Sequence, residues 1–208
     1  MAVGMDLDLP LLLADLGRPL LGYLSDKPLR CDQVHLGGFD RFAAYAGRAD
    51  VGLLLAAYEP YVKLAGASAA RAMNARIVTI IAPGAKASPT AVIGAGSIVQ
   101  HGTYIGEGVS LGQGVKVNVN ASVHHGSTIG DFTTISPHCA ILGECVIGRE
   151  CLIGAGSTVR NNVGIGDRVY IGMGAAVVND IPSDTLAYGV PAKPAGAFTP
   201  RKLVIPAG

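Results

Sequence analysis

An aliphatic residue recurs at every sixth position from Ile93 to Val177 without a break. Neither the 3.6-residue period of a helix nor the two-residue period of a strand produces this spacing. A strict period of six predicts a parallel β-helix, in which each hexad supplies a short strand and a turn and successive coils stack. The positions of the repeat are Ile93, Val99, Ile105, Leu111, Val117, Val123, Ile129, Ile135, Ile141, Ile147, Ile153, Val159, Ile165, Ile171 and Val177.

Three hexads complete one three-sided coil, so residues 18 apart should stack at about the 4.8 Å separation of neighbouring strands. Cys139, Cys145 and Cys151 each follow the aliphatic residue of their hexad by four positions, a slot that holds small or β-branched residues elsewhere. We interpret this slot as pointing inward and the three cysteines as core thiols. Their spacing puts them on different faces of the coil, which argues against a shared metal ion.

Three regions follow one another along the chain. Residues 1–80 alternate apolar runs with a helical pattern, which predicts a small α/β domain. Residues 81–180 form the β-helix, and 181–208 form a proline-rich, extended tail that lies along the β-helix or reaches a neighbour. The elements expected in the first region are strands at 20–24, 34–36, 51–56 and 76–80 and a helix at 59–73.

The composition excludes several classes of function. The chain carries 16 Lys and Arg against 15 Asp and Glu, a net charge of +1, so it has no basic footprint for nucleic acid. Its apolar runs are far shorter than a membrane-spanning helix, and residues 1–10 lack the basic and apolar parts of a signal peptide. We therefore expect a cytoplasmic protein without nucleic-acid or membrane partners.

Polar residues interrupt the repeat between residues 117 and 140. The 18-residue rule stacks Asn118 with Ser136, and it places His125 between Glu107 in the preceding coil and Gly143 in the following one. His125 is either a solvated turn residue or a general base, because an imidazole can accept a proton near neutral pH.

Three other histidines raise the alternative of a metal site, as in the trimeric β-helix carbonic anhydrases. The residues concerned are His101, His124 and His138. Their spacing does not bring all three to one edge of the coil, so no metal is expected.

The segments 118–125 (NVNASVHH), 129–132 (IGDF) and 189–194 (GVPAKP), together with the hexads, carry a family resemblance. The chain resembles left-handed β-helix sugar acetyltransferases of the PglD/NeuD/PerB type. The resemblance implies a truncated Rossmann-like α/β substrate-binding domain before the β-helix acyltransferase domain. It also implies a homotrimer with acetyl-CoA in the groove between adjacent β-helices. The acetyl group would pass directly to an amine or hydroxyl of a sugar, most simply a nucleotide-linked amino sugar.

The resemblance also assigns roles to residues. His125 would be the base, assisted by Glu107, and acetyl-CoA and the acceptor would be held by eight further residues. The acetyl-CoA contacts would be Thr134, Gly143, Ala155, Met173 and Lys193; the acceptor contacts would be Asn118, Asp26 and His138.

Four departures from the family pattern bear on these roles. The family's acidic residue directly after the base is Gly126 here, and Glu107 is the candidate replacement. A second family histidine falls on Thr134, whose hydroxyl can donate the same hydrogen bond, and a corner glycine is His138. The first strand and its glycine-rich phosphate loop are expected to be missing, with only 3–5 left of the loop's end. These departures leave open an alternative, a non-catalytic β-helix scaffold that binds CoA without acetylating a sugar.

Overall fold

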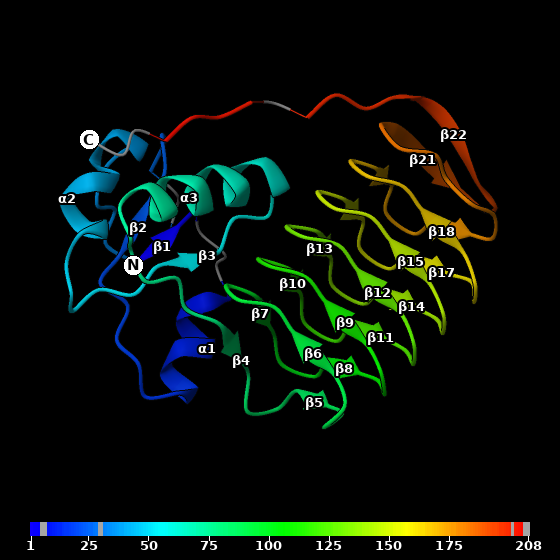
Figure 1. Ribbon diagram of the computed structural model, residues 1–208, viewed down its shortest axis with the longest axis horizontal. Coiled ribbons are helices and arrows are strands. Elements are labelled where there is room, and N and C mark those ends of the chain that lie inside the picture. The colour runs from blue at the N-terminus through cyan, green and yellow to red at the C-terminus, as the bar shows by residue number, and fades with distance from the viewer. Residues whose placement is uncertain (5–7, 29–30, 201, 206–208) are drawn as a thin grey trace.

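The computed structural model describes residues 1–4, 8–28, 31–200 and 202–205. A β-helix runs from Ile80 to Val177, and an N-terminal unit packs against its first coils (Figure 1). The chain then returns from the far end of the β-helix to the N-terminal unit. The two parts are therefore joined at both ends of the sequence.

The β-helix consists of three sheets whose strands pair in parallel at the expected 18-residue step. Lys116 pairs with Ile98 in the preceding coil and with Thr134 in the following one. The predicted stacking is confirmed. The first sheet contains β4 (Ile80–Ile81), β7 (Ile98–Val99), β10 (Lys116–Val117), β13 (Thr134–Ile135), β16 (Leu152–Ile153) and β19 (Tyr170–Ile171). The second contains β5 (Lys86–Ala87), β8 (Tyr104–Ile105), β11 (Ser122–Val123), β14 (Ala140–Ile141), β17 (Thr158–Val159) and β20 (Ala176–Val177). The third contains β6 (Val92–Ile93), β9 (Ser110–Leu111), β12 (Thr128–Ile129), β15 (Val146–Ile147) and β18 (Gly164–Ile165).

The aliphatic positions of the repeat fill the core of the β-helix, as expected. The slot four residues later also points inward, because Cys139, Cys145 and Cys151 are all at most 1% exposed. Ser97, Ser127, Thr133 and Ser157 in this slot each donate to a carbonyl 15 residues later, as Ser97 Oγ does to Gly112 O at 3.0 Å. The Cys139 thiol makes the equivalent contact with Gly154 O, also at 3.0 Å. The cysteines are therefore structural members of the core.

The N-terminal unit is a small parallel sheet in the order β2-β1-β3, with strands β1 (Ala2–Val3), β2 (Tyr23–Leu24) and β3 (Leu54–Leu55). The expectation that the first strand is missing is wrong. Ala2 pairs with both Tyr23 and Leu54, so β1 is the central strand of the sheet. Gly4 follows it with φ +67°, and Met5, the last residue of the expected loop remnant, lies outside the described residues.

Helices cover the sheet of the N-terminal unit. The expected helix at 59–73 is present as α3 (Pro60–Ala72), with proline in its first turn, where the missing N–H is not needed. The sequence reading missed α1 (Leu9–Asp15), η1 (Phe39–Arg41) and α2 (Phe42–Ala46). The strand expected at 34–36 is reduced to an isolated bridge at His35. The strand expected at 76–80 is an isolated bridge at Ile77, and its last residue, Ile80, begins β4.

Two buried lysines connect α3 and the loop after β3 to the β-helix. Lys63 on α3 donates to Gly114 O at 3.0 Å and to Thr133 O at 3.1 Å. Lys116 on β10 donates to Ala56 O at 3.0 Å. Both side chains are almost completely buried, and burial, together with the nearby Lys116, lowers the pKa of Lys63 well below its usual value.

The tail begins as a hairpin rather than as a single extended segment. Strands β21 (Thr185–Gly189) and β22 (Ala192–Ala197) pair antiparallel, and β21 continues the sheet of β19. The chain then runs back past α3 (Figure 1). Ile205 is buried in the core of the N-terminal unit. Among the described residues, none of the helices has the length and apolarity needed to cross a membrane.

Candidate functional site

His125 lies at one corner of the coil, which we call the His edge, defined by Glu107, His125 and Gly143. The backbone continues from coil to coil along this edge, since Gly126 N donates to Glu107 O and Glu144 N donates to His125 O, both at 2.9 Å. The three residues are thus stacked in the order predicted from the 18-residue rule.

The imidazole of His125 reaches across Gly143. A Cβ on Gly143 would lie 2.6 Å from His125 Cε1 and would collide with Nε2, so only glycine leaves room for this ring orientation. Gly143 itself is buried, while His125 is exposed. The rigid coil therefore presents the Nε2 end of an imidazole at an open edge, where it can accept a proton.

Asn118 and Thr134 do not lie on the His edge. They belong to the sheet that faces the N-terminal unit, and both side chains are buried. The Asn118 amide donates to Ile135 O at 2.9 Å, and the Thr134 hydroxyl donates to Tyr58 O at 2.9 Å. Within one chain, these two predicted contacts are therefore separated from His125.

Tyr58 was not singled out by the sequence as a site residue. It follows β3 and lies against this same sheet, with its hydroxyl 2.7 Å from Ser136 Oγ. Burial raises the pKa of the Tyr58 phenol, so the hydroxyl stays protonated at neutral pH. Its sequence signal was weak: a single aromatic residue directly after a buried strand.

A second corner of the coil, which we call the Met edge, is defined by Pro137, Ala155 and Met173. These residues stack through hydrogen bonds from Gly156 N to Pro137 O and from Gly174 N to Ala155 O, at 3.0 Å and 2.8 Å. Met173 is 77% exposed, an unusual position for a large apolar side chain. Ala155 and Met173 are thus brought together, but on a different edge from His125.

The remaining predicted contacts lie around these edges. His138, at the Met edge, adopts φ +59°, the left-handed conformation that normally favours glycine, and its imidazole is exposed. Lys193 lies on β22 and is exposed. Asp26 follows β2, where its carboxylate accepts a hydrogen bond from Phe39 N at 3.5 Å. In the part of the chain that the structure describes, none of the three forms a hydrogen bond or ion pair with His125.

Glu144 lies directly beside the His edge, and the sequence pattern did not indicate a role for it. It follows Gly143 and adopts φ +58°. A Cβ on Gly126 would lie 2.5 Å from Glu144 Cδ and 2.7 Å from its Oε2, so the carboxylate occupies the space beside Gly126. Only the orientation of the side chain reveals this contact, and no spacing rule would have predicted it.

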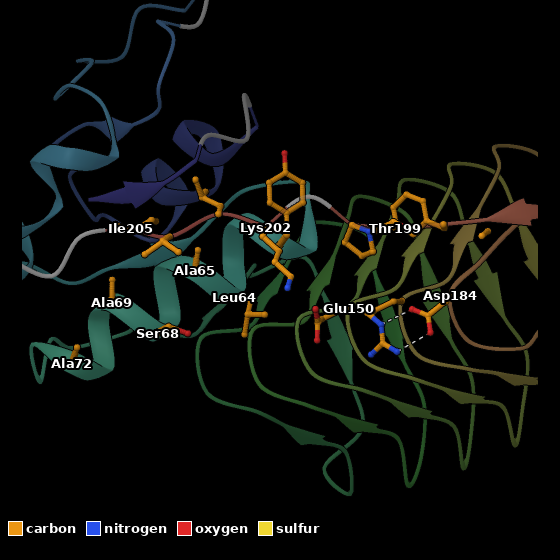
Figure 2. Close-up of a pocket in the computed structure, with 17 residues that line it drawn as sticks. Leu64, Ala65, Ser68, Ala69, Ala72, Glu150, Asp184, Thr199, Lys202 and Ile205 are labelled. Atoms are coloured by element: carbon orange, nitrogen blue, oxygen red, sulfur yellow. Dashed lines mark hydrogen bonds and ion pairs between the residues drawn. The ribbon is translucent and has the colours of Figure 1, made fainter.

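A cavity of about 790 Å³ lies away from these residues, between α3, the returning tail and a third corner of the β-helix. Leu64 and Ser68 line it from the helix, and Lys202 closes it from the tail (Figure 2). At the coil corner Arg168 pairs with Asp184, with Nε 2.6 Å from Oδ1. No predicted site residue lines this cavity.

The three histidines weighed for a metal do not converge. His101 Nε2 lies 2.8 Å from Asp15 Oδ2, the ring of His124 packs against Tyr104 with centroids 5.6 Å apart, and His138 lies at the Met edge. Within the part of the chain that the structure describes, no group of three His, Cys, Asp or Glu side chains could hold a metal ion.

Comparison with known proteins places this architecture. A family model for bacterial transferase hexapeptide (six repeats) matches residues 126–161. No curated protein sequence matches the chain.

Solved structures resemble nearly the whole chain. The acetyltransferase domain of PglB from Neisseria gonorrhoeae, in complex with acetyl coenzyme A, is 30% identical, with a TM-score of 0.81 over 88% of this chain and 91% of that one. PerB from Caulobacter crescentus, in complex with CoA and GDP-perosamine, is 26% identical, with a TM-score of 0.86 over 94% and 95%. WeeI from Acinetobacter baumannii, 20% identical over 90% and 92% with a TM-score of 0.80, shares the fold. The chain belongs to the hexapeptide-repeat sugar acetyltransferases with a left-handed β-helix.

Proposed function

We propose that this protein transfers an acetyl group from acetyl-CoA to an amino or hydroxyl group of a nucleotide-linked sugar, with His125 as the general base. The observation that carries the proposal is the exposed imidazole of His125, whose Nε2 end is held across Gly143 on a rigid edge. PglB, at 30% identity, was solved with acetyl coenzyme A, and PerB with CoA and GDP-perosamine.

Acetyl-CoA would supply an activated thioester carbonyl. His125 would accept the proton of the acceptor amine or hydroxyl as that group attacks the carbonyl, forming the new C–N or C–O bond. The C–S bond then breaks, and His125 returns the proton to the departing CoA thiolate. A covalent acyl-enzyme is not needed, and the three β-helix cysteines are buried with raised thiol pKa values.

The proposed assembly is a homotrimer in which one site uses two chains. His125 and Gly143 lie on the His edge, whereas Ala155 and Met173 lie on the Met edge of the same chain. A groove between adjacent β-helices can bring the His edge of one copy beside the Met edge of the next. The exposed apolar side chain of Met173 would then contact the pantetheine arm.

The acceptor would bind where the N-terminal sheet faces the β-helix. In open α/β sheets, ligands bind beyond the carboxyl ends of parallel strands. Gly4, Asp26 and Tyr58 all lie just beyond those ends, and Tyr58 also contacts Ser136 in the β-helix. Asn118 stacks one coil from Ser136 and lines the same sheet. We place the sugar nucleotide there.

The first test is turnover with acetyl-CoA and a panel of free and nucleotide-linked amino sugars, measured as release of CoA. We expect His125→Ala to lower kcat/KM by about 10²- to 10⁴-fold, the usual contribution of a general base, with an unchanged unfolding temperature. His124→Ala is the matched control, because its ring packs on Tyr104 and does not reach Gly143. Normal turnover by His125→Ala would refute the assignment.

A complementation experiment tests the shared site. Chains carrying His125→Ala and chains carrying Met173→Glu should each be inactive as pure assemblies. Co-expressed, they should regain part of the activity, because a mixed assembly contains some sites with an intact His edge and an intact Met edge. No recovery in verified mixed trimers would place the whole site on one chain. Binding of CoA without turnover of any acceptor would favour the scaffold alternative.

A further inference from the structure

At the His edge, a side chain from each of two neighbouring coils lies over a glycine of the other coil. The corner dipeptide of one coil is His125-Gly126, and that of the next is Gly143-Glu144, with Glu144 N donating to His125 O at 2.9 Å. The imidazole lies over Gly143, and the carboxylate lies over Gly126. Each glycine thus makes room for the functional side chain of the other coil.

This arrangement places the Glu144 carboxylate beside Gly126. A side chain on residue 126 would start where the Glu144 carboxylate now lies, within 2.5 Å of Cδ. The carboxylate forms no hydrogen bond or ion pair with any described residue, so its charge is available to a cation at this edge. The residue before Gly126 is His125, and proton transfer to it creates such a cation.

Glu107, the replacement expected from the sequence, is placed differently. It stacks on the other side of His125 and is exposed. Its backbone oxygen accepts from Gly126 N at 2.9 Å. Its carboxylate, like that of Glu144, makes no hydrogen bond or ion pair with the described residues, but the three atoms nearest to a Cβ at Gly126 all belong to Glu144 and none to Glu107. No contact directs it over the His125-Gly126 corner. Stacking distance alone therefore does not identify the partner of the base.

We propose that Glu144 is the positioning residue for His125. Its carboxylate takes the place of a side chain at position 126 and stabilises the imidazolium formed when His125 accepts the acceptor's proton. This inference rests on the proposed function of His125. The other charged or titratable groups at the edge are Glu107 in the preceding coil, His124 beside His125, and Arg160 two coils beyond His124.

The test compares Glu144→Gln with Glu107→Gln, two isosteric changes at exposed positions of the same edge. A carboxylate at the same corner favours the charged form of an imidazole, and the neutral amide of Gln does not. For Glu144→Gln we therefore expect kcat to fall about tenfold and the acidic limb of the pH–rate profile to move to lower pH by about one unit. The KM for acetyl-CoA and the unfolding temperature should not change. The opposite ranking of the two variants would overturn the proposal.

A relocation variant supplies the rescue. Glu144→Gly should lose activity like Glu144→Gln, and adding Gly126→Glu should restore most of it, since the removed carboxylate leaves the space that the new side chain needs. Position 126 has φ +66° and position 144 has φ +58°, so the strain of a side chain at 126 is offset by the glycine introduced at 144, and the double variant should be about as stable as the wild type. Activity no better than that of Glu144→Gly alone would contradict the proposal.

An NMR titration separates this inference from the proposed function. The ring signals of His125 in the wild-type protein and in Glu144→Gln can be followed against pH without any substrate. A titration midpoint at lower pH in the variant supports the carboxylate–imidazole pair even if no acceptor is turned over. Identical midpoints would refute the pair even if the wild-type protein is an active acetyltransferase.

Discussion

The β-helix and the N-terminal unit hold their short strands together in different ways. In the β-helix each interior strand pairs with strands 18 residues before and after it, and the same few residue types fill the core of every coil. In the N-terminal unit, three two-residue strands depend on helices and on the returning tail. Because its pattern repeats, the β-helix can be predicted from the sequence, whereas the N-terminal unit is specified by individual contacts.

The largest expected difference between the regions is thiol reactivity. Burial raises the pKa of Cys139 and Cys151 to about 11 and also raises that of Cys145. At pH 8 a thiol with a pKa of about 11 is ionised in roughly one molecule in a thousand. Cys31, in the N-terminal unit, is partly exposed. We expect Ellman's reagent to titrate one thiol rapidly in the native protein and all four in guanidinium.

Rapid labelling of more than one thiol in the native state would show that the coils open locally. Mass spectrometry of the labelled protein identifies the residue that reacted. Cys31→Ser is the control, and it should remove the fast phase without changing the slow one.

A cavity tests the β-helix core directly. Ile141 is fully buried between stacked coils, and Ile141→Ala should lower the free energy of unfolding by about 2–5 kcal/mol, because the paired strands cannot collapse into the space. Val146→Ala, at a position 60% exposed in the adjacent sheet, should change it by less than about 0.5 kcal/mol. Denaturation in guanidinium measures both. Equal effects would mean that the core of the β-helix relaxes to fill the cavity that Ile141→Ala leaves.

The sequence predicted the β-helix more completely than the N-terminal unit. The period of six located the coils from Ile93 to Val177, and the 18-residue rule put His125 between Glu107 and Gly143, because each coil repeats one environment. It did not find Glu144, since the carboxylate's place over Gly126 depends on side-chain orientation. β1 spans two residues and carries no pattern, and α1 was missed although Pro10 stands in its first turn.

The buried connection between the regions gives the next prediction. Lys63→Ala removes a donor from Gly114 O and from Thr133 O, and Thr133 O keeps the hydrogen bond from Lys116 N. The loss of the donor to the buried Gly114 O should cost about 1–3 kcal/mol of unfolding free energy. A neutral amine has two N–H groups, which suffice for these two acceptors. Lys63→Met should cost less than Lys63→Ala, because it keeps most of the volume.

The pH dependence of this connection has a definite sign. Burial lowers the pKa of Lys63 in the folded state, so the folded protein binds fewer protons than the unfolded chain between that lowered pKa and the usual lysine value of 10.5. The contribution of Lys63 to stability therefore rises as pH increases towards that value. The stability difference between wild type and Lys63→Met should grow in favour of the wild type from pH 7 to pH 9.5. A constant difference would mean that Lys63 is charged in the folded state.

The smallest effect is expected at the exposed connection between the same two regions. Asp15 Oδ2 lies 2.8 Å from His101 Nε2, but the two side chains are 46% and 29% exposed. An ion pair in contact with water contributes little, so Asp15→Asn should lower the free energy of unfolding by less than about 1 kcal/mol. The difference should shrink further in 1 M salt, because dissolved ions screen exposed charges. If Asp15→Asn proved as costly as Lys63→Ala, the N-terminal unit would be held by its surface contacts, and buried polar contacts would not be what joins it to the β-helix.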